Sequence, residues 1–260
     1  SVGYSLGICF SMNLYFLYSR RGVVLKNSYL AKILQLIRII LAPLQIFSLI
    51  FTGARGPILF TAISVVSFLV FLFYGNIHKI SRKKFQEIII ISSAAMLRLV
   101  YFFNAVIASN YGYLRFIQLF DITNIKKDES AYERILYYNE ILNAILKSPI
   151  YGNGFGGSYY LINGYPHNIV LELLIDGGVL WLTLIMGFLI RCIVVTIKLV
   201  KQDFVYFLIF IILLKAIIML LFSGTYILCS ELWFIVPVII EQVRIGKQKS
   251  QGTVCSRIEL

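Results

Sequence analysis

The order of apolar and polar residues along the chain predicts a series of membrane spans. Apolar stretches of about 17 or more residues are long enough to cross roughly 30 Å of hydrocarbon as helices. We expect seven such spans, at residues 2–18, 33–51, 57–74, 85–107, 178–197, 204–222 and 226–240. A soluble core of this size would show short amphipathic periods instead. The pattern therefore predicts an all-α integral membrane protein, a bundle of about seven transmembrane helices.

One long segment, residues 108–168, interrupts this series between the fourth and fifth spans. Within it, residues 132–147 carry apolar side chains near helical spacing, which predicts an amphipathic helix on the outer membrane surface. Pro149 should end this helix, and a glycine-rich turn follows at residues 152–157. A second helix is expected to start near Asn168, with a break at Gly177–Gly178 before the next span.

Charge gives the predicted bundle an orientation. Only 14% of the residues are charged, against about 25% in an ordinary soluble domain. The net charge of +12 would suit nucleic acid, but the basic residues cluster in short loops between spans, as they do in cytoplasmic loops of membrane proteins. We therefore expect no nucleic-acid partner. The long loop, with five basic and five acidic residues, falls on the opposite, external side, and residues 241–260 form a cytoplasmic tail.

The domain organisation follows from these spans. Residues 1–260 are expected to form a single polytopic membrane domain, with the long loop outside the cell. The chain begins SVGYSLGICF, already apolar and without an initiator Met. We expect it to be the C-terminal part of a longer polytopic protein.

Charged residues at membrane depth are candidates for function, because they are costly there. Lys215 and Glu231, on neighbouring spans, are expected to pair structurally. Arg98 lies in an outer half without an obvious acidic partner, and Arg55 lies at the outer end of its span. Together they make the outer side of the bundle electropositive, which suits a lipid diphosphate. An interfacial anchor is the alternative for Arg55. Two further arginines lie near cytoplasmic ends and can snorkel: Arg38 and Arg191.

The external loop holds a glycine pattern and a histidine. Gly152, Gly154 and Gly157 match G-x-G-x-x-G, but no strand precedes them, so a dinucleotide site is excluded. The pattern leaves two interpretations, amides that face an anion near a helix start or a plain turn. His167 stands at an apparent helix N-terminus, where an imidazole can act as a base. The other histidine, His78, lies in a basic cytoplasmic loop.

Three segments resemble the O-antigen polymerase and O-antigen ligase family, over residues 51–199. The stretch GNGFGGSYYLINGYPHNIVLELLIDGGVLW resembles the family signature, a P-x-x-G-x-G turn followed by H-N-x-x-L-E-x-x-x-x-x-G and a transmembrane helix. Its matching residues are Pro149, Gly152, Gly154, His167, Asn168, Leu171, Glu172 and Gly178. FTGARGPILF, residues 51–60, is similar to the family's T-G-S-R-G segment, with Ala54 where serine is common. SAYERILYYNEIL, residues 130–142, is similar to the loop helix that carries the family's arginine, here Arg134.

The resemblance implies a glycosyltransferase that uses polyprenyl-diphosphate-linked glycans at the outer face of the plasma membrane. By this resemblance, Arg55 and Arg134 would hold the diphosphate. His167 would orient or deprotonate the acceptor hydroxyl, or contact the diphosphate. The remaining candidates for substrate binding are Arg98, Gly152, Gly154, Asn168 and Glu172. Neither a metal nor another cofactor is expected, because the leaving group is already a diphosphate and no carboxylate cluster is evident. The expected partners are the lipid-linked oligosaccharide, membrane lipid and other polysaccharide-assembly membrane proteins.

Three activities remain open. A polymerase would join O-antigen or capsule repeat units, whereas a ligase would attach the finished glycan to a lipid A core. The abundance of Ile, Lys, Tyr and Phe favours the polymerase. A transporter or flippase of lipid-linked sugars would place its charged sites near mid-membrane, in two related halves. The polar candidates here gather at the outer face instead, and no half-repeat is evident.

Overall fold

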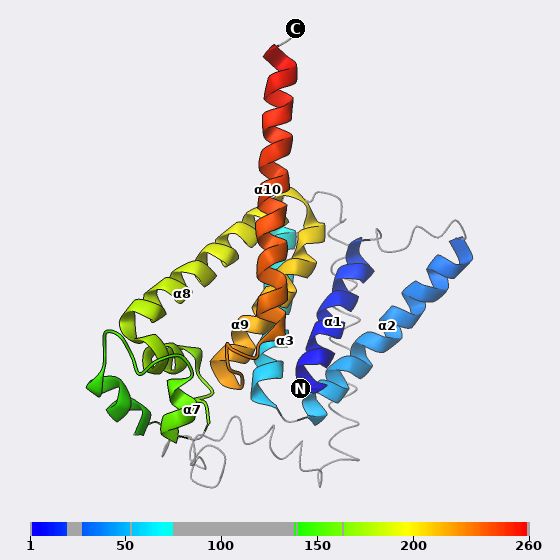
Figure 1. Cartoon of the computed structure of the whole chain (residues 1–260). Helices are drawn as coiled ribbons and strands as arrows, with labels where there is room; N and C mark the ends of the chain where they lie inside the picture. Colours follow the sequence, from blue (N-terminus) through cyan, green and yellow to red (C-terminus); the bar gives the residue numbers. More distant parts are fainter. Residues whose placement is uncertain are drawn as a thin grey trace. The chain divides into compact units, whose positions relative to one another are not determined.

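The computed structural model describes residues 2–19, 28–52, 54–74, 138, 140–162 and 164–258 (Figure 1). Every regular element in these ranges is a helix, so this part of the chain is all-α as predicted. The named helices are α1 (Val2–Ser19), α2 (Ser28–Phe51), α3 (Arg55–Tyr74), α7 (Gly157–Ile162), α8 (Ile169–Gln202), the 3-10 helix η2 (Phe204–Tyr206), α9 (Phe207–Phe222) and α10 (Ser230–Ile258). Residues 140–147 are helical as well. The chain divides into two compact units, Ser1–Tyr132 and Glu133–Leu260.

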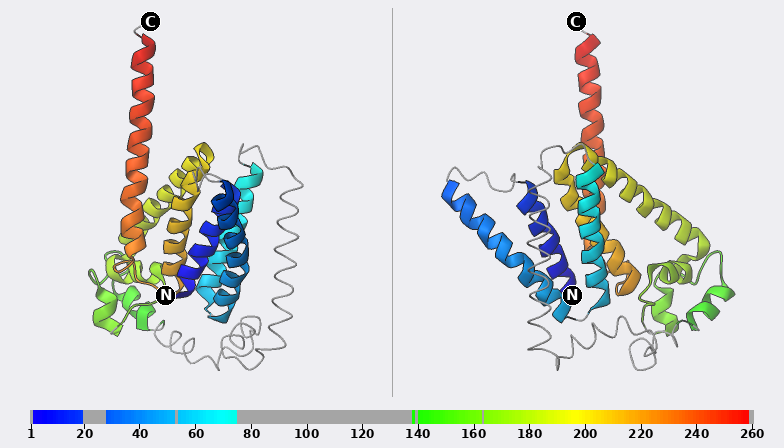
Figure 2. Two further views of the ribbon diagram at one scale, coloured as in Figure 1. Left: turned by 90° about the vertical axis from the view of Figure 1, so that its right-hand side faces the viewer. Right: turned by 180° about the vertical axis from the view of Figure 1, so that it is seen from behind.

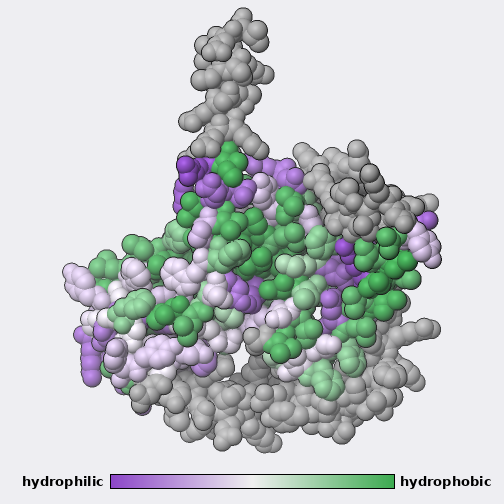
Figure 3. All heavy atoms as spheres, turned by 45° about the vertical axis from the view of Figure 1, so that its right-hand side comes forward, coloured by the Kyte–Doolittle hydropathy of each residue, from purple (hydrophilic) through white to green (hydrophobic). Residues whose placement is uncertain are grey.

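Several of these helices are long and apolar enough to cross a membrane. Within the described ranges, three meet both conditions: Lys32–Phe51, Ile169–Gln202 and Phe204–Phe222. Apolar side chains also cover much of the visible surface of the helices (Figure 3), and only 6% of the most apolar window of α2 is buried. Such surfaces suit lipid, so the chain is a multi-pass membrane protein. The number of seven spans stays a prediction, since residues 85–107 lie outside the described ranges.

Several boundaries of the described helices agree with the predicted spans, but α2 begins five residues earlier than predicted, α8 ends five residues later, and the last span begins later. Helices α1, α2 and α3 end at or next to the predicted residues, and α9 ends at Phe222 as expected. The last span was expected from residue 226, but residues 223–229 form a turn and α10 begins at Ser230. Within this turn Thr225, Tyr226 and Cys229 are buried, whereas Leu228 is 74% exposed. Helix α10 then continues to Ile258, through most of the predicted cytoplasmic tail.

In the N-terminal unit, small residues bring α1 close to α3 (Figure 2). Gly7 lies so near that a Cβ there would come 2.7 Å from the Oγ1 atom of Thr61. One turn further along α1, the hydroxyls of Ser11 and Ser64 are hydrogen bonded at 2.7 Å. Gly3, Gly7 and Ser11 thus form a stripe of small residues at four-residue spacing, which lets two membrane helices pack closely.

Arg38 joins α2 to α1 in the same unit. Its Nη1 donates to the carbonyl of Phe16 at 3.3 Å, and its guanidinium lies 5.0 Å from the centre of the Phe16 ring. The Asn13 amide nitrogen donates to the Arg38 carbonyl at 2.9 Å. Arg38 was expected to snorkel toward water, but these contacts hold it against α1, where a cation beside the last carbonyls of a helix is favourable.

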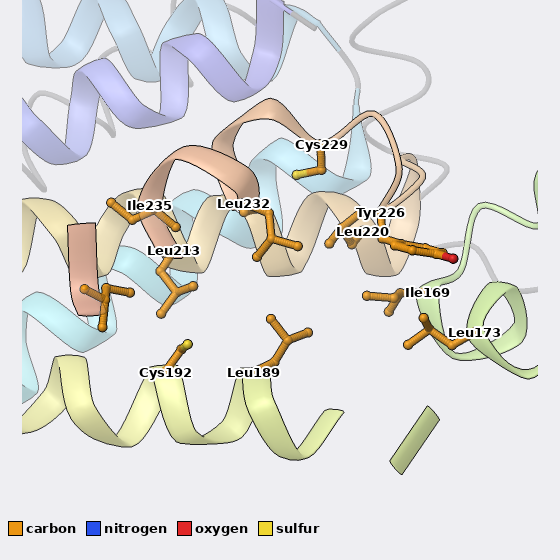
Figure 4. Close-up of a cluster of buried hydrophobic side chains, with 12 residues drawn as sticks. Ile169, Leu173, Leu189, Cys192, Leu213, Leu220, Tyr226, Cys229, Leu232 and Ile235 are labelled. Atoms are coloured by element: carbon orange, nitrogen blue, oxygen red, sulfur yellow. The ribbon is translucent and has the colours of Figure 1, made fainter. Parts of the chain in front are cut away.

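In the C-terminal unit, α8, α9 and α10 surround an apolar core (Figure 4). Leu213 and Leu220 of α9 are fully buried, and Leu173 of α8 packs with them. The Lys215 ammonium of α9 pairs with the Glu231 carboxylate of α10, which confirms the predicted structural pair. The apolar contacts and this ion pair together fix α9 against α10.

Candidate functional site

A break in α8 organises the end of the C-terminal unit that contains the glycine-rich loop. Gly178 has φ 63° and ψ −160°, which interrupts the helix at the predicted position. An interrupted helix leaves carbonyls without partners at the end of its first segment. The glycine-rich loop supplies donors for two of them. The amide of Asn153 donates to the carbonyl of Ile175 at 2.6 Å, and the amide of Gly154 donates to that of Asp176 at 2.9 Å.

The same loop supplies acceptors for the second segment of α8. The amide of Val179 donates to the carbonyl of Pro149 at 2.9 Å, and that of Leu180 donates to the carbonyl of Ile150 at 3.4 Å. The loop approaches so closely that a Cβ on Gly178 would lie 2.3 Å from the Ile150 carbonyl oxygen. The P-x-x-G-x-G turn therefore packs directly against Gly178, the later glycine of the signature.

This contact corrects the role expected for Gly152 and Gly154. Their amides were candidates to face an anion, but both donate within the chain. Gly152 donates to the Ser148 carbonyl at 3.0 Å, and Gly154 donates to Asp176 as described. The sequence could not show the Gly154 bond, because its acceptor, the Asp176 carbonyl, is free only where α8 is broken. The glycine loop is thus a structural clamp on α8, and the amides of Gly152 and Gly154 are already bonded within the chain.

His167 lies immediately before the first segment of α8. Asn168 is the N-cap of this helix, and its Oδ1 accepts from the amides of Val170 at 2.9 Å and Leu171 at 3.4 Å. The expected helix start is confirmed, and Asn168 serves first as a cap. His167 is half-buried and has φ 53°, a left-handed conformation that is uncommon outside glycine and occurs often at functional sites.

Aromatic rings connect His167 to α7. The centre of the Tyr165 ring lies 4.4 Å from that of the His167 imidazole, and the Tyr159 ring lies 6.1 Å from Tyr165. Burial, followed by the nearby Glu172 carboxylate, raises the pKa of Tyr159. The Tyr159 hydroxyl therefore stays protonated near neutral pH and adds no negative charge to the site.

Glu172 is fully buried, and its partners are now defined. Its carboxylate accepts from the hydroxyl of Thr225 and from the backbone amide of Tyr226, the latter at 3.3 Å. One turn along α8, the carboxylate of Asp176 accepts from the Tyr226 hydroxyl at 2.8 Å. Glu172 was a candidate substrate ligand, but both of its oxygens accept bonds inside the protein. Sequence reasoning missed Thr225 and Tyr226. A second carboxylate four residues after Glu172 was the available signal, since a buried pair of acids needs donors nearby.

Three predicted arginines do not belong to the described part of this unit. Arg55 is the first residue of α3, in the N-terminal unit. Arg98 and Arg134 lie outside the described residues, so their roles stay predictions. In the ranges that the structure does describe, no three His, Cys, Asp or Glu side chains gather as metal ligands do. The structure thus brings His167, Asn168, the glycine loop and Glu172 together around the first segment of α8.

The family model for the O-antigen ligase matches residues 40–186, more than half of the 260-residue chain. The chain belongs to the O-antigen ligase family. Its function therefore lies in the assembly of surface polysaccharide by a membrane glycosyltransferase-like enzyme of the ligase and polymerase type. The match includes the glycine loop, His167 and the break in α8, and it ends before α9. No curated protein and no solved structure matches the chain.

Proposed function

We propose that this member of the O-antigen ligase family is a polymerase of cell-surface polysaccharide repeat units. It would transfer a polyprenyl-diphosphate-linked glycan to an acceptor sugar at the outer face of the bacterial plasma membrane. The observation that carries the proposal is the placement of His167, half-buried and left-handed at the start of α8, within the region that matches the family. An imidazole held in this way can serve as a base toward a hydroxyl.

The transfer needs two kinds of group. The acceptor hydroxyl oxygen attacks the anomeric carbon, its proton passes to His167, and the bond from that carbon to the diphosphate oxygen breaks. The electron pair stays with the diphosphate, whose charge Arg55 and Arg134 would stabilise through bidentate hydrogen bonds. Arg98 would add positive charge at the same face. The N-terminal end of α8 also favours negative charge beside His167.

This mechanism needs no metal, because the diphosphate leaves as a stable anion paired with arginine. The experiment is transfer in the presence of EDTA by the purified protein in lipid nanodiscs. We expect the rate to equal that without EDTA. A rate that falls with EDTA and returns with added Mg²⁺ would contradict metal-independent transfer while leaving the family assignment untouched.

The decisive experiment uses a polyprenyl-diphosphate-linked oligosaccharide as the only substrate and follows glycan length by gel electrophoresis. The wild type should build chains, and His167→Ala should lower the rate by about 10²–10⁴-fold, the usual contribution of a general base. Arg134→Ala should lower it as well. His78→Ala and Arg191→Ala are matched controls, since neither residue is a candidate for the site by its position in the sequence, and Arg191 is exposed on α8. Undiminished chain length in both site variants would refute these roles.

The ligase is the second candidate, because the matching family model is described as O-antigen ligase. The same preparation, supplied with lipid A core as an additional acceptor, separates the two activities. A polymerase extends the lipid-linked glycan in the absence of core. A ligase leaves its length unchanged and transfers it to the core. Uptake of labelled lipid-linked sugar without any new glycosidic bond would support a transporter instead.

The external position of the loop can be tested independently of activity. Phe155, in the glycine loop, and Lys201, at the opposite end of α8, are both exposed. In a background without the native cysteines, Phe155→Cys should react with an impermeant maleimide added outside spheroplasts, whereas Lys201→Cys should react only after lysis. The reverse pattern would place the site on the cytoplasmic side and contradict the proposed topology.

A further inference from the structure

The first segment of α8, Ile169–Gly177, is not held in place by the continuity of its own helix. The break at Gly178 separates it from the part of α8 that is long enough to cross the membrane. A helix that is interrupted in this way can change its direction relative to the next segment. The glycine loop holds the last carbonyls of the first segment, and side-chain contacts hold the rest of it. His167 precedes this segment by two residues, and its placement depends on the same contacts.

The contacts come from the turn between α9 and α10. The Thr225 hydroxyl and the Tyr226 amide both donate to Glu172, and the Tyr226 hydroxyl donates to Asp176. All four side chains are at least 95% buried. Water therefore offers no ready replacement for these bonds, and losing one of them leaves a buried polar group without a partner.

Apolar contacts hold the turn against the same segment. Figure 4 shows the ring of Tyr226 beside Ile169 and Leu173, and all three belong to one buried cluster. Glu172 lies three residues after Ile169, the first residue of α8, which is about 4.5 Å along the helix axis at 1.5 Å per residue. A shift of Glu172 is therefore transmitted to the start of α8 by a short and rigid piece of helix.

We propose that Thr225 and Tyr226 are positioning residues of the transferase site. Through Glu172 and Asp176, they hold the helix segment that presents His167 to the acceptor hydroxyl. This inference rests on the proposed role of His167. Both residues lie beyond residue 186, where the family match ends, so the α9–α10 turn completes a site whose signature lies upstream.

Thr225→Val tests the proposal, because it removes one hydroxyl and keeps the shape of the side chain. We expect kcat for glycan transfer to fall by about 10²-fold, the effect of displacing a reacting group by about 1 Å. The KM for the lipid-linked donor should stay within about twofold, since its diphosphate is bound by other residues. Thr225→Ser, which keeps the hydroxyl, should restore most of the rate.

Thr196→Val is the matched control. Thr196 is fully buried in the same helix, on the far side of the break, and its hydroxyl donates only to the Cys192 carbonyl within its own helix. It should keep wild-type kcat. Equal losses of kcat in Thr225→Val and Thr196→Val, or no rescue by Thr225→Ser, would show that the hydroxyl has only a general effect on stability and would overturn the proposal.

Hydrogen–deuterium exchange separates the failure of this proposal from the failure of the proposed function. Thr225→Val should speed exchange in residues 167–177 and leave the second segment of α8 unchanged, whether or not the protein transfers glycan. If Thr225→Val exchanged faster than a wild type that showed no transferase activity, the positioning contact would stand and the proposed function would be refuted. Unchanged exchange and unchanged kcat in Thr225→Val, with an active wild type, would refute the positioning role alone.

Discussion

Replacing Gly178 by alanine should destabilise the C-terminal unit, whereas the same change at Gly187 in the same helix should not. Gly178 has φ 63° and ψ −160°, a conformation that costs an L-residue about 1–3 kcal/mol. The new Cβ would also lie 2.3 Å from the Ile150 carbonyl oxygen and 2.7 Å from that of Pro149. The loop must then withdraw, and the loss of each of the two hydrogen bonds that its carbonyls accept would cost about 0.5–1.5 kcal/mol. We expect a total loss of about 2–6 kcal/mol.

Alanine substitutions at two further glycines, Gly187 and Gly154, separate the cost of backbone strain from the cost of steric contact. A Cβ on Gly187 would meet no heavy atom within 4 Å, and Gly187 has ordinary helical backbone. Alanine there should stabilise the helix by about 0.5–1 kcal/mol, because it reduces the freedom of the unfolded chain. Gly154 has φ 95° and equally open space, so Gly154→Ala should show the strain alone, about 1–3 kcal/mol. The predicted order of stability is Gly187→Ala above wild type, then Gly154→Ala, then Gly178→Ala.

The assay is equilibrium unfolding in mixed micelles, followed by tryptophan fluorescence. The chain has two tryptophans, Trp181 and Trp233, and both lie in the C-terminal unit, so the signal reports the unit that contains the break. If Gly178→Ala unfolded at the same detergent fraction as Gly154→Ala, the glycine loop would not be docked against α8. The assignment of Pro149 and Ile150 as acceptors at the break would then be wrong.

Three other predictions follow from single contacts. Lys215→Met should destabilise the C-terminal unit by slightly less than the roughly 3–5 kcal/mol lost when a fully buried pair is broken, because 30% of the Glu231 side chain is exposed. Adding Glu231→Gln should recover part of this loss in the same fluorescence assay, and additive losses would argue against a pair. Gly7→Leu should lower the midpoint of thermal aggregation, because α3 leaves no room for a side chain there; an unchanged midpoint would contradict the close packing of α1 on α3. Burial, with the hydrogen bond to Asp176, raises the pKa of Tyr226 above its ordinary 10.0. The folded protein therefore keeps this proton where the unfolded chain loses it, so stability should fall as the pH rises from about 9 to 11, and Tyr226→Phe should reduce that fall. An identical fall in Tyr226→Phe would show that other groups cause it.

Features that depend on neighbouring residues were predictable from the sequence. The length of each apolar stretch predicts the helices α1, α2, α3 and α9, since one span needs a certain number of apolar residues in a row. The paired glycines at residues 177 and 178 predict the break in α8, because glycine adopts conformations that a helix former resists. Asn168 predicts a helix start, because its side chain caps the amides two and three residues later.

The partners across the site were decided by the tertiary structure. Glu172 and its donor Thr225 are 53 residues apart, and the Gly154 amide finds its acceptor at Asp176, across α7 and the start of α8. Nothing local in the sequence relates these pairs, because they meet only after α8, α9 and α10 have packed. The same packing gives the Gly154 amide an acceptor within the chain and holds the Glu172 carboxylate against its two donors.

The sequence by itself therefore determined the class of the protein, an all-helical membrane protein of the O-antigen ligase family, and the residue that carries the proposed chemistry. His167 is recognisable because its neighbours along the chain form a motif. The tertiary structure decided what holds His167 in place, because a buried carboxylate accepts hydrogen bonds from whichever donors the packing brings to it. In this protein those donors are Thr225 and Tyr226, in a turn that lies beyond the family's motifs.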